Sequence, residues 1–106
     1  MTQPSPGRQL LLSHVSERDW REQVLVWAGR SGWLVYFTWS SLHSPAGFPD
    51  LVLCRPPRLI IAELKSARGK PSQRQQVWLT RLKRCPGVES YLWRPEDETR
   101  VQDLLR

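Results

Sequence analysis

A chain of 106 residues suits one compact domain with a modest hydrophobic core. Its 40% of hydrophobic and 25% of charged residues exclude an intrinsically disordered chain, and no apolar run approaches the roughly 20 residues of a membrane span. Sixteen Lys and Arg against ten Asp and Glu give a net charge of +6, which favours a polyanionic partner such as nucleic acid, although a basic protein without such a partner fits the charge equally well.

Residues 1–15 contain two prolines and no clear hydrophobic period, so we expect a flexible arm with a short apolar piece at Leu10 to Leu12. The segment lacks a charged region followed by an apolar stretch, which is the pattern of a secretion signal. We therefore expect a cytoplasmic protein with a single folded domain over residues 16–106.

The residues after Ser16 predict a first helix that ends near Gly32. Ser16 is a suitable N-cap, and Asp19 three positions later resembles the second half of a capping box. Gly32 can adopt the left-handed conformation of a C-cap. Apolar residues repeat at i, i+4, i+7 and i+8 and form one stripe along this helix: Trp20, Val24, Trp27 and Ala28.

Three strands are predicted next. Residues 33–39 are rich in β-branched and aromatic residues and indicate a first strand, followed by a loop over residues 40–48. Two further apolar runs, residues 51–54 and 59–64, flank the turn sequence Arg55-Pro56-Pro57-Arg58. These two runs are expected to form a hairpin.

A basic loop over residues 66–71 precedes the next helix, for which Ser72 and Gln75 make a capping box. One face of that helix is expected to carry Gln75, Trp78, Leu79 and Leu82. Cys85-Pro86-Gly87 ends the helix, residues 88–93 indicate a fourth strand, and residues 96–105 a closing helix. The order αβββαβα predicts an α/β layer fold with a mixed sheet and a C-terminal helix.

Tryptophan and cysteine are informative in opposite ways. Six Trp is a high number for this length, and we expect most of them in the core, although indole rings also stack on nucleic-acid bases. Cys54 and Cys85 lie far apart, and neither they nor His14 and His43 show the close spacing of a zinc site. Free, buried thiols are therefore expected.

The hairpin carries the strongest chemical signal. If its turn centres between Pro56 and Pro57, Asp50 lies directly opposite Glu63, and two like charges in such a pair destabilise it. Lys65, two residues beyond Glu63, points to the same face of the sheet. A divalent cation such as Mg²⁺, held between the two carboxylates, would relieve the repulsion, since Mg²⁺ commonly binds one or two carboxylates.

That cation could polarise a scissile phosphate and activate a water molecule, while Lys65 would orient the water or stabilise developing negative charge. Two alternatives stay open. Glu63 and Lys65 could form a surface ion pair with Asp50 as a turn residue, and a register slip of one residue would place the carboxylates on opposite faces.

The segment Gly47-Phe48-Pro49-Asp50-Leu51-Val52-Leu53, followed by Glu63-Leu64-Lys65, resembles the PD-(D/E)XK nuclease signature, and most closely that of the VRR-NUC (virus-type replication–repair nuclease) group. Further similarity lies in Gly32-Trp33, in Gln75 with Trp78-Leu79, and in Trp93-Arg94-Pro95, so that the resemblance covers about residues 16–105. Glu98 departs from it, because an aromatic residue often follows the position of Asp97 in that group.

The resemblance implies a restriction-endonuclease-like αβββαβ core and a Mg²⁺- or Mn²⁺-dependent endonuclease. Its substrates would be branched DNA such as Holliday junctions or flaps, and the enzyme would often be a homodimer. By this resemblance Asp50 and Glu63 bind metal, Lys65 activates water and Gln75 supports the site. A capping role alone would also explain Gln75.

The group also has a metal-site glutamate on its first helix, for which this chain offers Glu17 and Glu22. Glu17 is favoured because it shares the apolar stripe, whereas Glu22 lies on the opposite side of the helix. An acidic residue in the first helical turn also suits the helix dipole without any metal. The choice between the two glutamates stays open here.

Basic residues gather after Lys65, and we expect them to contact DNA phosphates, although such a run is also typical of a solvated surface. They are Arg68, Lys70, Arg74, Arg81 and Lys83. The main alternative function is a non-catalytic DNA-binding module that retains the nuclease fold. A ribonuclease of the same fold would need a contact to the 2′-hydroxyl group, which the sequence does not identify.

Overall fold

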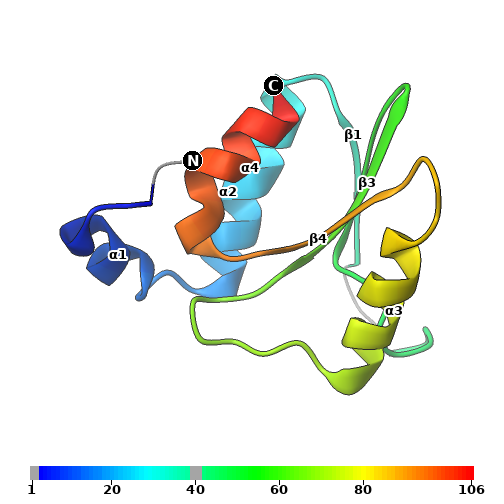
Figure 1. Cartoon of the computed structure of the whole chain (residues 1–106), viewed down its shortest axis with the longest axis horizontal. Coiled ribbons are helices and arrows are strands. Elements are labelled where there is room, and N and C mark those ends of the chain that lie inside the picture. The colour runs from blue at the N-terminus through cyan, green and yellow to red at the C-terminus, as the bar shows by residue number, and fades with distance from the viewer. Residues whose placement is uncertain (1–2, 39–41) are drawn as a thin grey trace.

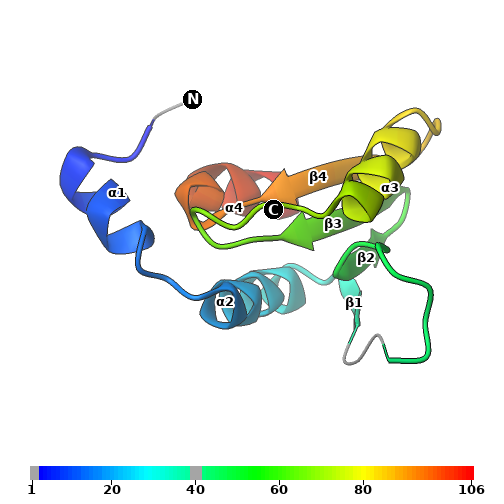
Figure 2. The same ribbon diagram turned by 90° about the horizontal axis from the view of Figure 1, so that it is seen from below.

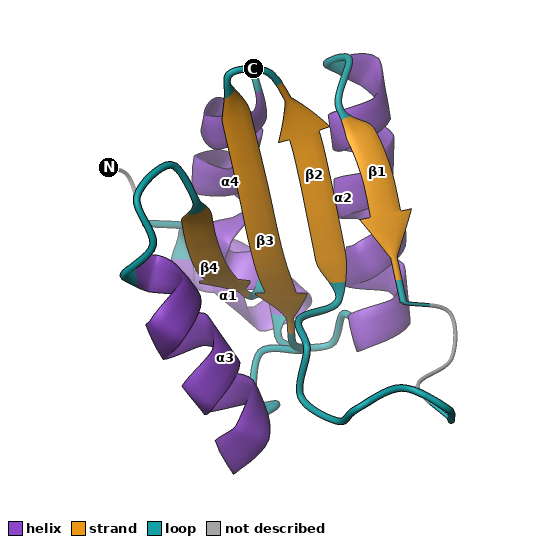
Figure 3. Ribbon diagram, turned by 90° about the vertical axis from the view of Figure 1, so that its right-hand side faces the viewer, coloured by secondary structure: helices purple, strands orange, loops and turns teal. Residues whose placement is uncertain are grey.

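The computed structural model describes residues 3–38 and 42–106. Its centre is a four-stranded sheet in the order β1 (Leu34–Phe37), β2 (Leu51–Arg55), β3 (Arg58–Leu64) and β4 (Glu89–Trp93) (Figure 3). β1, β2 and β3 are antiparallel neighbours, whereas β4 runs parallel to β3. The predicted α/β fold with a mixed sheet is therefore confirmed.

Helices cover the two faces of the sheet unequally. α2 (Glu17–Arg30) and α4 (Glu98–Leu105) lie together on one face, and α3 (Gln73–Lys83) lies on the other, beside β4 (Figures 1 and 2). A single 3-10 turn, η1 (Pro95–Asp97), joins β4 to α4. None of the helices in the described residues combines the length and the apolar composition that crossing a membrane requires.

The core lies between the sheet and the pair α2 and α4. Alternate residues of the strands point into it, because successive side chains of a strand face opposite sides. Two indole groups are satisfied within it: Trp20 Nε1 donates to the carbonyl of Trp93 at 3.0 Å, and Trp33 Nε1 donates to that of Leu105 at 2.8 Å. The buried core includes Trp20, Val24, Ala28, Trp33, Leu51, Leu53, Ile60, Ala62, Leu64, Trp93, Val101 and Leu105.

The hairpin has the predicted register. β2 and β3 pair from Leu51 with Ala62 to Arg55 with Arg58, around a turn centred between Pro56 and Pro57. A one-residue slip is thereby excluded, and the core-facing and opposite faces of both strands are those expected.

The helix ends also agree with the sequence. Ser16 accepts a hydrogen bond from the backbone N–H of Asp19, and Gly32 has a positive φ of 80°. Ser72 and Gln75 form a reciprocal capping box at the start of α3. Short polar side chains satisfy N–H groups that have no partner within a helix, so these caps determine where α2 and α3 begin.

The N-terminal segment differs from the expected arm without regular structure. Residues Pro6–Leu12 form a helix, α1, whose N-cap Ser5 accepts from the N–H of Arg8. Leu12 is buried, and the Arg8 guanidinium donates two hydrogen bonds to Glu98, at 3.0 and 3.3 Å. The prediction was wrong here because a helix of seven residues is held by such contacts rather than by a long apolar stripe.

Smaller differences concern element ends and thiols. The first strand covers Leu34–Phe37 within the predicted 33–39, of which residue 39 lies outside the described residues, and the last helix begins at Glu98 instead of residue 96. Both cysteines are free, as expected, but Cys54 is only partly buried and Cys85 is exposed. The expected burial of Cys85 is therefore wrong, because it lies at the exposed end of α3.

Candidate active site

Asp50 and Glu63 lie side by side at one end of the hairpin. Asp50 directly precedes β2 and Glu63 is the second-last residue of β3, so antiparallel pairing brings them to the same edge of the sheet. The backbone N–H of Asp50 donates to Glu63 Oε1 at 3.2 Å, and the N–H of Leu64 donates to Asp50 Oδ2 at 2.9 Å. The predicted juxtaposition of the two carboxylates is confirmed.

Glu63 is an acidic residue held inside the protein. Its side chain is 1% exposed, and its Oε2 lies 2.8 Å from Gln75 Nε2 and 3.4 Å from Lys65 Nζ. Burial raises the pKa of Glu63 to about 7, the negative charge of Asp50 raises it further, and the ammonium group of Lys65 opposes the rise. Ionised Glu63 is thus costly and gains from any added positive charge.

Lys65 lies between two glutamates. Its ammonium group is 3.4 Å from Glu63 and 3.9 Å from Glu17 Oε1, and its side chain is 16% exposed. Its backbone N–H donates to the carbonyl of Trp93 at 3.1 Å, which continues the pairing of β3 with β4. The cation is therefore fixed beside the carboxylates and still accessible from solvent.

The structure distinguishes the two glutamates of α2. Glu17 is in the first turn, on the side of the helix that carries the buried Trp20 and Val24, and it reaches Lys65. Glu22 is an exposed residue that pairs with Arg18 at 3.5 Å. Of the two candidates, the structure therefore brings Glu17 to the site.

Gln75 serves two groups with one amide. Its Oε1 accepts from the backbone N–H of Ser72 at 2.8 Å, and its Nε2 donates to Glu63 Oε2 at 2.8 Å. The capping role and the supporting role, which the sequence left as alternatives, are both present. The start of α3 is thereby joined to the buried carboxylate at the end of β3.

The pair Asp50 and Glu63 fits a hard divalent cation, because both are oxygen donors and their charges repel each other. Leu64 is the one described residue that hydrogen-bonds the Asp50 carboxylate, so Asp50 retains acceptor positions. Across residues 3–38 and 42–106, no three His, Cys, Asp or Glu side chains gather closely enough to hold a metal together. Glu17 contacts the site through Lys65, and its role as a metal ligand stays a prediction.

The basic residues form an exposed rim on one side of the site. Two lie in the loop between β3 and α3 and three on α3 itself: Arg68, Lys70, Arg74, Arg81 and Lys83. Arg94, for which the sequence gave no individual role, holds this loop by donating from Nη2 to the carbonyl of Gly69 at 2.7 Å. Its own N–H donates to Asp97 at 2.9 Å. Contact between the rim and DNA phosphates stays a prediction.

The loop before β2 passes unusually close to α3 at Gly47. Gly47 has a φ of 102°, and a Cβ atom placed on it would lie 2.7 Å from the Cβ of Arg74. This approach brings Phe48 against Trp78, with ring centroids 5.0 Å apart at 79°. The sequence showed no relation between these two aromatic residues, because they are 30 positions apart and belong to different elements.

Comparison with known proteins leaves the assignment to these residues. No protein-family model matches this chain, and the search of curated proteins found no match either.

Proposed function

We propose that this chain is a metal-dependent DNA endonuclease that hydrolyses phosphodiester bonds. The observation that supports this most strongly is the adjacent pair of carboxylates, Asp50 and Glu63, with Lys65 at the same end of the hairpin. A purely structural ion pair does not require a second carboxylate beside a buried glutamate, since the added charge destabilises it.

Each residue has a separate task in this proposal. Asp50 and Glu63 would hold Mg²⁺ or Mn²⁺, which when bound would stabilise negative charge on the phosphate and ease deprotonation of water. Lys65 would orient the attacking water or stabilise charge that develops on the phosphate oxygens. Gln75 would fix the orientation of Glu63. Water would attack the phosphorus, the bond to the leaving oxygen would break, and solvent would protonate that oxygen.

The resemblance to VRR-NUC nucleases supports a narrower form of the proposal. It favours branched DNA as substrate, Arg68, Lys70, Arg74 and Arg81 as phosphate contacts, Glu17 as an auxiliary metal-site residue, and a homodimer. A cytoplasmic location also belongs to the proposal, because Cys54 and Cys85 are both free thiols.

A plasmid-nicking assay tests the central proposal. Supercoiled DNA should be nicked in the presence of Mg²⁺ or Mn²⁺, remain intact in EDTA, and remain intact with Lys65→Ala under all conditions. A panel of duplex, flap, splayed-arm and four-way-junction DNA then tests the preference for branches. Tight DNA binding without metal-dependent cleavage of any substrate would indicate a non-catalytic DNA-binding module instead.

A further inference from the structure

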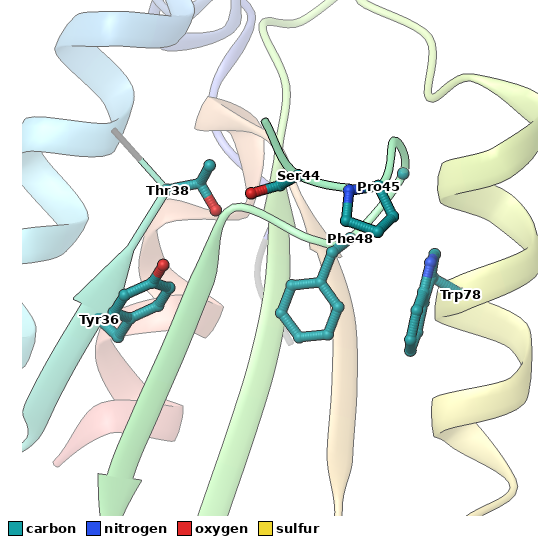
Figure 4. A pocket seen from close by; sticks show the side chains of 7 residues that line it. Tyr36, Thr38, Ser44, Pro45, Phe48 and Trp78 are labelled. Carbon is teal, nitrogen blue, oxygen red and sulfur yellow. The ribbon is translucent and has the colours of Figure 1, made fainter. Parts of the chain in front are cut away.

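A pocket lined by aromatic residues lies next to the candidate site. Its volume is about 330 Å³, and it is formed by β1, the loop before β2 and α3. Figure 4 shows the ring of Phe48 between Tyr36 and Trp78, with the hydroxyl groups of Thr38 and Ser44 near one end. This size is at the lower end for small-molecule pockets and suits one flat ring system.

The three rings are more exposed than their chemistry favours. Tyr36 is 63% exposed, Trp78 40% and Phe48 37%, although three of the other tryptophans lie in the core. An exposed cluster of large apolar side chains is typical of a binding surface. Aromatic rings that are open to solvent are suited to stacking on another flat, apolar ring.

The pocket shares its supporting elements with the carboxylate site. Phe48 is two residues before Asp50 in the same loop, and Trp78 is one helical turn after Gln75, whose amide binds Glu63. A strand whose phosphate reached Asp50 and Glu63 would therefore carry a neighbouring base past the three rings.

Positive charge flanks the rings. Arg74 packs against Gly47 at the rim of the pocket, and Arg81 is one turn beyond Trp78 on α3. Both arginines are exposed. Aromatic rings between exposed cations are the combination that binds single-stranded nucleic acid, since bases stack on the rings and phosphates pair with the cations. An apolar protein side chain would make no use of these charges.

We propose that this pocket binds an unpaired nucleobase of the DNA strand that is cleaved, an inference that rests on the proposed nuclease function. The base stacks on Trp78 or Tyr36, and the hydroxyl groups of Thr38 and Ser44 meet its polar edge. A base within a duplex would first have to leave its stack at a cost in free energy. The pocket thus favours substrates that already carry unpaired nucleotides beside the scissile phosphate.

A binding experiment in EDTA tests this without requiring cleavage. The probes are two fluorescein-labelled strands of roughly 12 nucleotides, a common site size for such surfaces. One is oligothymidylate, and the other has the same phosphates but an abasic sugar at every position. Fluorescence anisotropy should show that the wild-type protein binds the thymidylate strand roughly tenfold more tightly.

Two pairs of variants locate the effect. Trp78→Ala and Tyr36→Ala should each lose most of the preference for the thymidylate strand and keep the affinity for the abasic one. Val77→Ala and Leu34→Ala are matched controls on the same helix and strand, 46% and 75% exposed and outside the pocket lining, and should bind as the wild type does. Tyr36→Ala also guards against misfolding of Trp78→Ala, whose ring contacts Phe48.

Equal affinity of the wild-type protein for the two strands would overturn the inference, as would an equal loss of preference in the control variants. Base preference without nicking in Mg²⁺ or Mn²⁺ would instead contradict the proposed nuclease function and leave the pocket assignment intact. The two failures are therefore distinguishable.

Discussion

Gln75 donates a hydrogen bond of 2.8 Å to Glu63, and the orientation of its amide is determined at the other end. Its carbonyl oxygen accepts from Ser72 as part of the capping box, so the NH₂ group must point towards the carboxylate. The first turn of α3 and the buried glutamate of β3 are consequently joined through one side chain. A change at the start of this helix is expected to reach the candidate site.

Gln75→Glu separates the two roles of this residue. A glutamate can still accept from Ser72 and maintain the capping box, but it offers no N–H to Glu63 and adds a negative charge. Since a hydrogen bond to a charged group contributes about 1.5–3 kcal/mol, cleavage should fall roughly tenfold or more while the helix persists by circular dichroism. Ser72→Ala is the control: it should lower the free energy of unfolding by about 1 kcal/mol and change cleavage little. Full activity of Gln75→Glu would leave Gln75 with capping alone.

Asp50→Ala, Glu63→Ala and Lys65→Ala should each abolish cleavage. DNA affinity should stay within a few-fold of the wild type, because it comes mostly from phosphate contacts elsewhere on the surface. Nicking assays with Mg²⁺ or Mn²⁺ and binding titrations in EDTA measure the two effects separately. Any variant that still cleaves removes its residue from the proposed machinery.

Glu17→Gln should weaken cleavage strongly and raise the metal concentration that half-maximal activity requires. The physical reason is that Glu17 lies 3.9 Å from the ammonium group of Lys65 and adds to the negative charge at the site. Glu22→Gln is the matched control on the same helix, because Glu22 is exposed and pairs with Arg18. Metal titrations of both variants decide the matter, and a stronger effect from Glu22 would contradict the assignment.

Glu63 should make stability depend on pH in EDTA. Its pKa rises from an ordinary value of 4.5 to about 7 in the folded chain, chiefly through burial, so the native state keeps a proton that the unfolded state has lost. Unfolding then releases that proton between these values, and stability should fall as pH increases through the window. One such group contributes at most about 1.4 kcal/mol per pH unit.

Thermal melts at pH 4.5 and at pH 7 measure this slope, and Glu63→Gln supplies the comparison because it removes the titrating group. The variant should lose less stability across the window than the wild type does. Parallel curves for the two proteins would show that Glu63 does not titrate there.

Asp50→Asn tests the repulsion between the two carboxylates. An asparagine can still accept from the N–H of Leu64, and the backbone bond from position 50 to Glu63 is unaffected, so the substitution removes charge and little else. In EDTA the variant should melt at or above the wild-type temperature, as relief of strain at a functional site often stabilises.

Excess Mg²⁺ or Mn²⁺ should reverse that order. A ligand at 100 times its dissociation constant stabilises the native state by roughly 2.7 kcal/mol, and about 1 kcal/mol shifts the midpoint by roughly 4–8 °C in a domain of this size. The wild-type protein should show this gain and Asp50→Asn should show little of it. If Asp50→Asn is less stable in EDTA and responds to metal like the wild type, Asp50 is a structural turn residue.

Features that depend on near neighbours in the chain could be predicted from the sequence. Pro56 and Pro57 determine the turn and with it the register that places Asp50 beside Glu63. Ser16 and Ser72 mark the starts of two helices through their own hydrogen bonds. Each of these effects acts over a few residues or across one hairpin, and the order of elements followed from them.

Features that depend on distant residues were missed. The helix α1 is attached through Arg8 to Glu98, 90 positions away, and its seven residues are too few to show a hydrophobic period. The aromatic pocket combines Tyr36, Phe48 and Trp78 from three separate elements, and a preference for core positions is the usual expectation for a tryptophan. Only the packing of α3 against the loop before β2 shows that these rings meet.

That packing depends on the missing side chain of Gly47, whose Cα passes over Arg74 with no room for another carbon. Any larger residue there must push the loop and α3 apart, and Gln75 would leave Glu63 with the helix. A homologue could then retain the aspartate, glutamate and lysine and still have lost its activity. Among related sequences, a glycine at this position is therefore a better sign of a working enzyme than the charged residues alone.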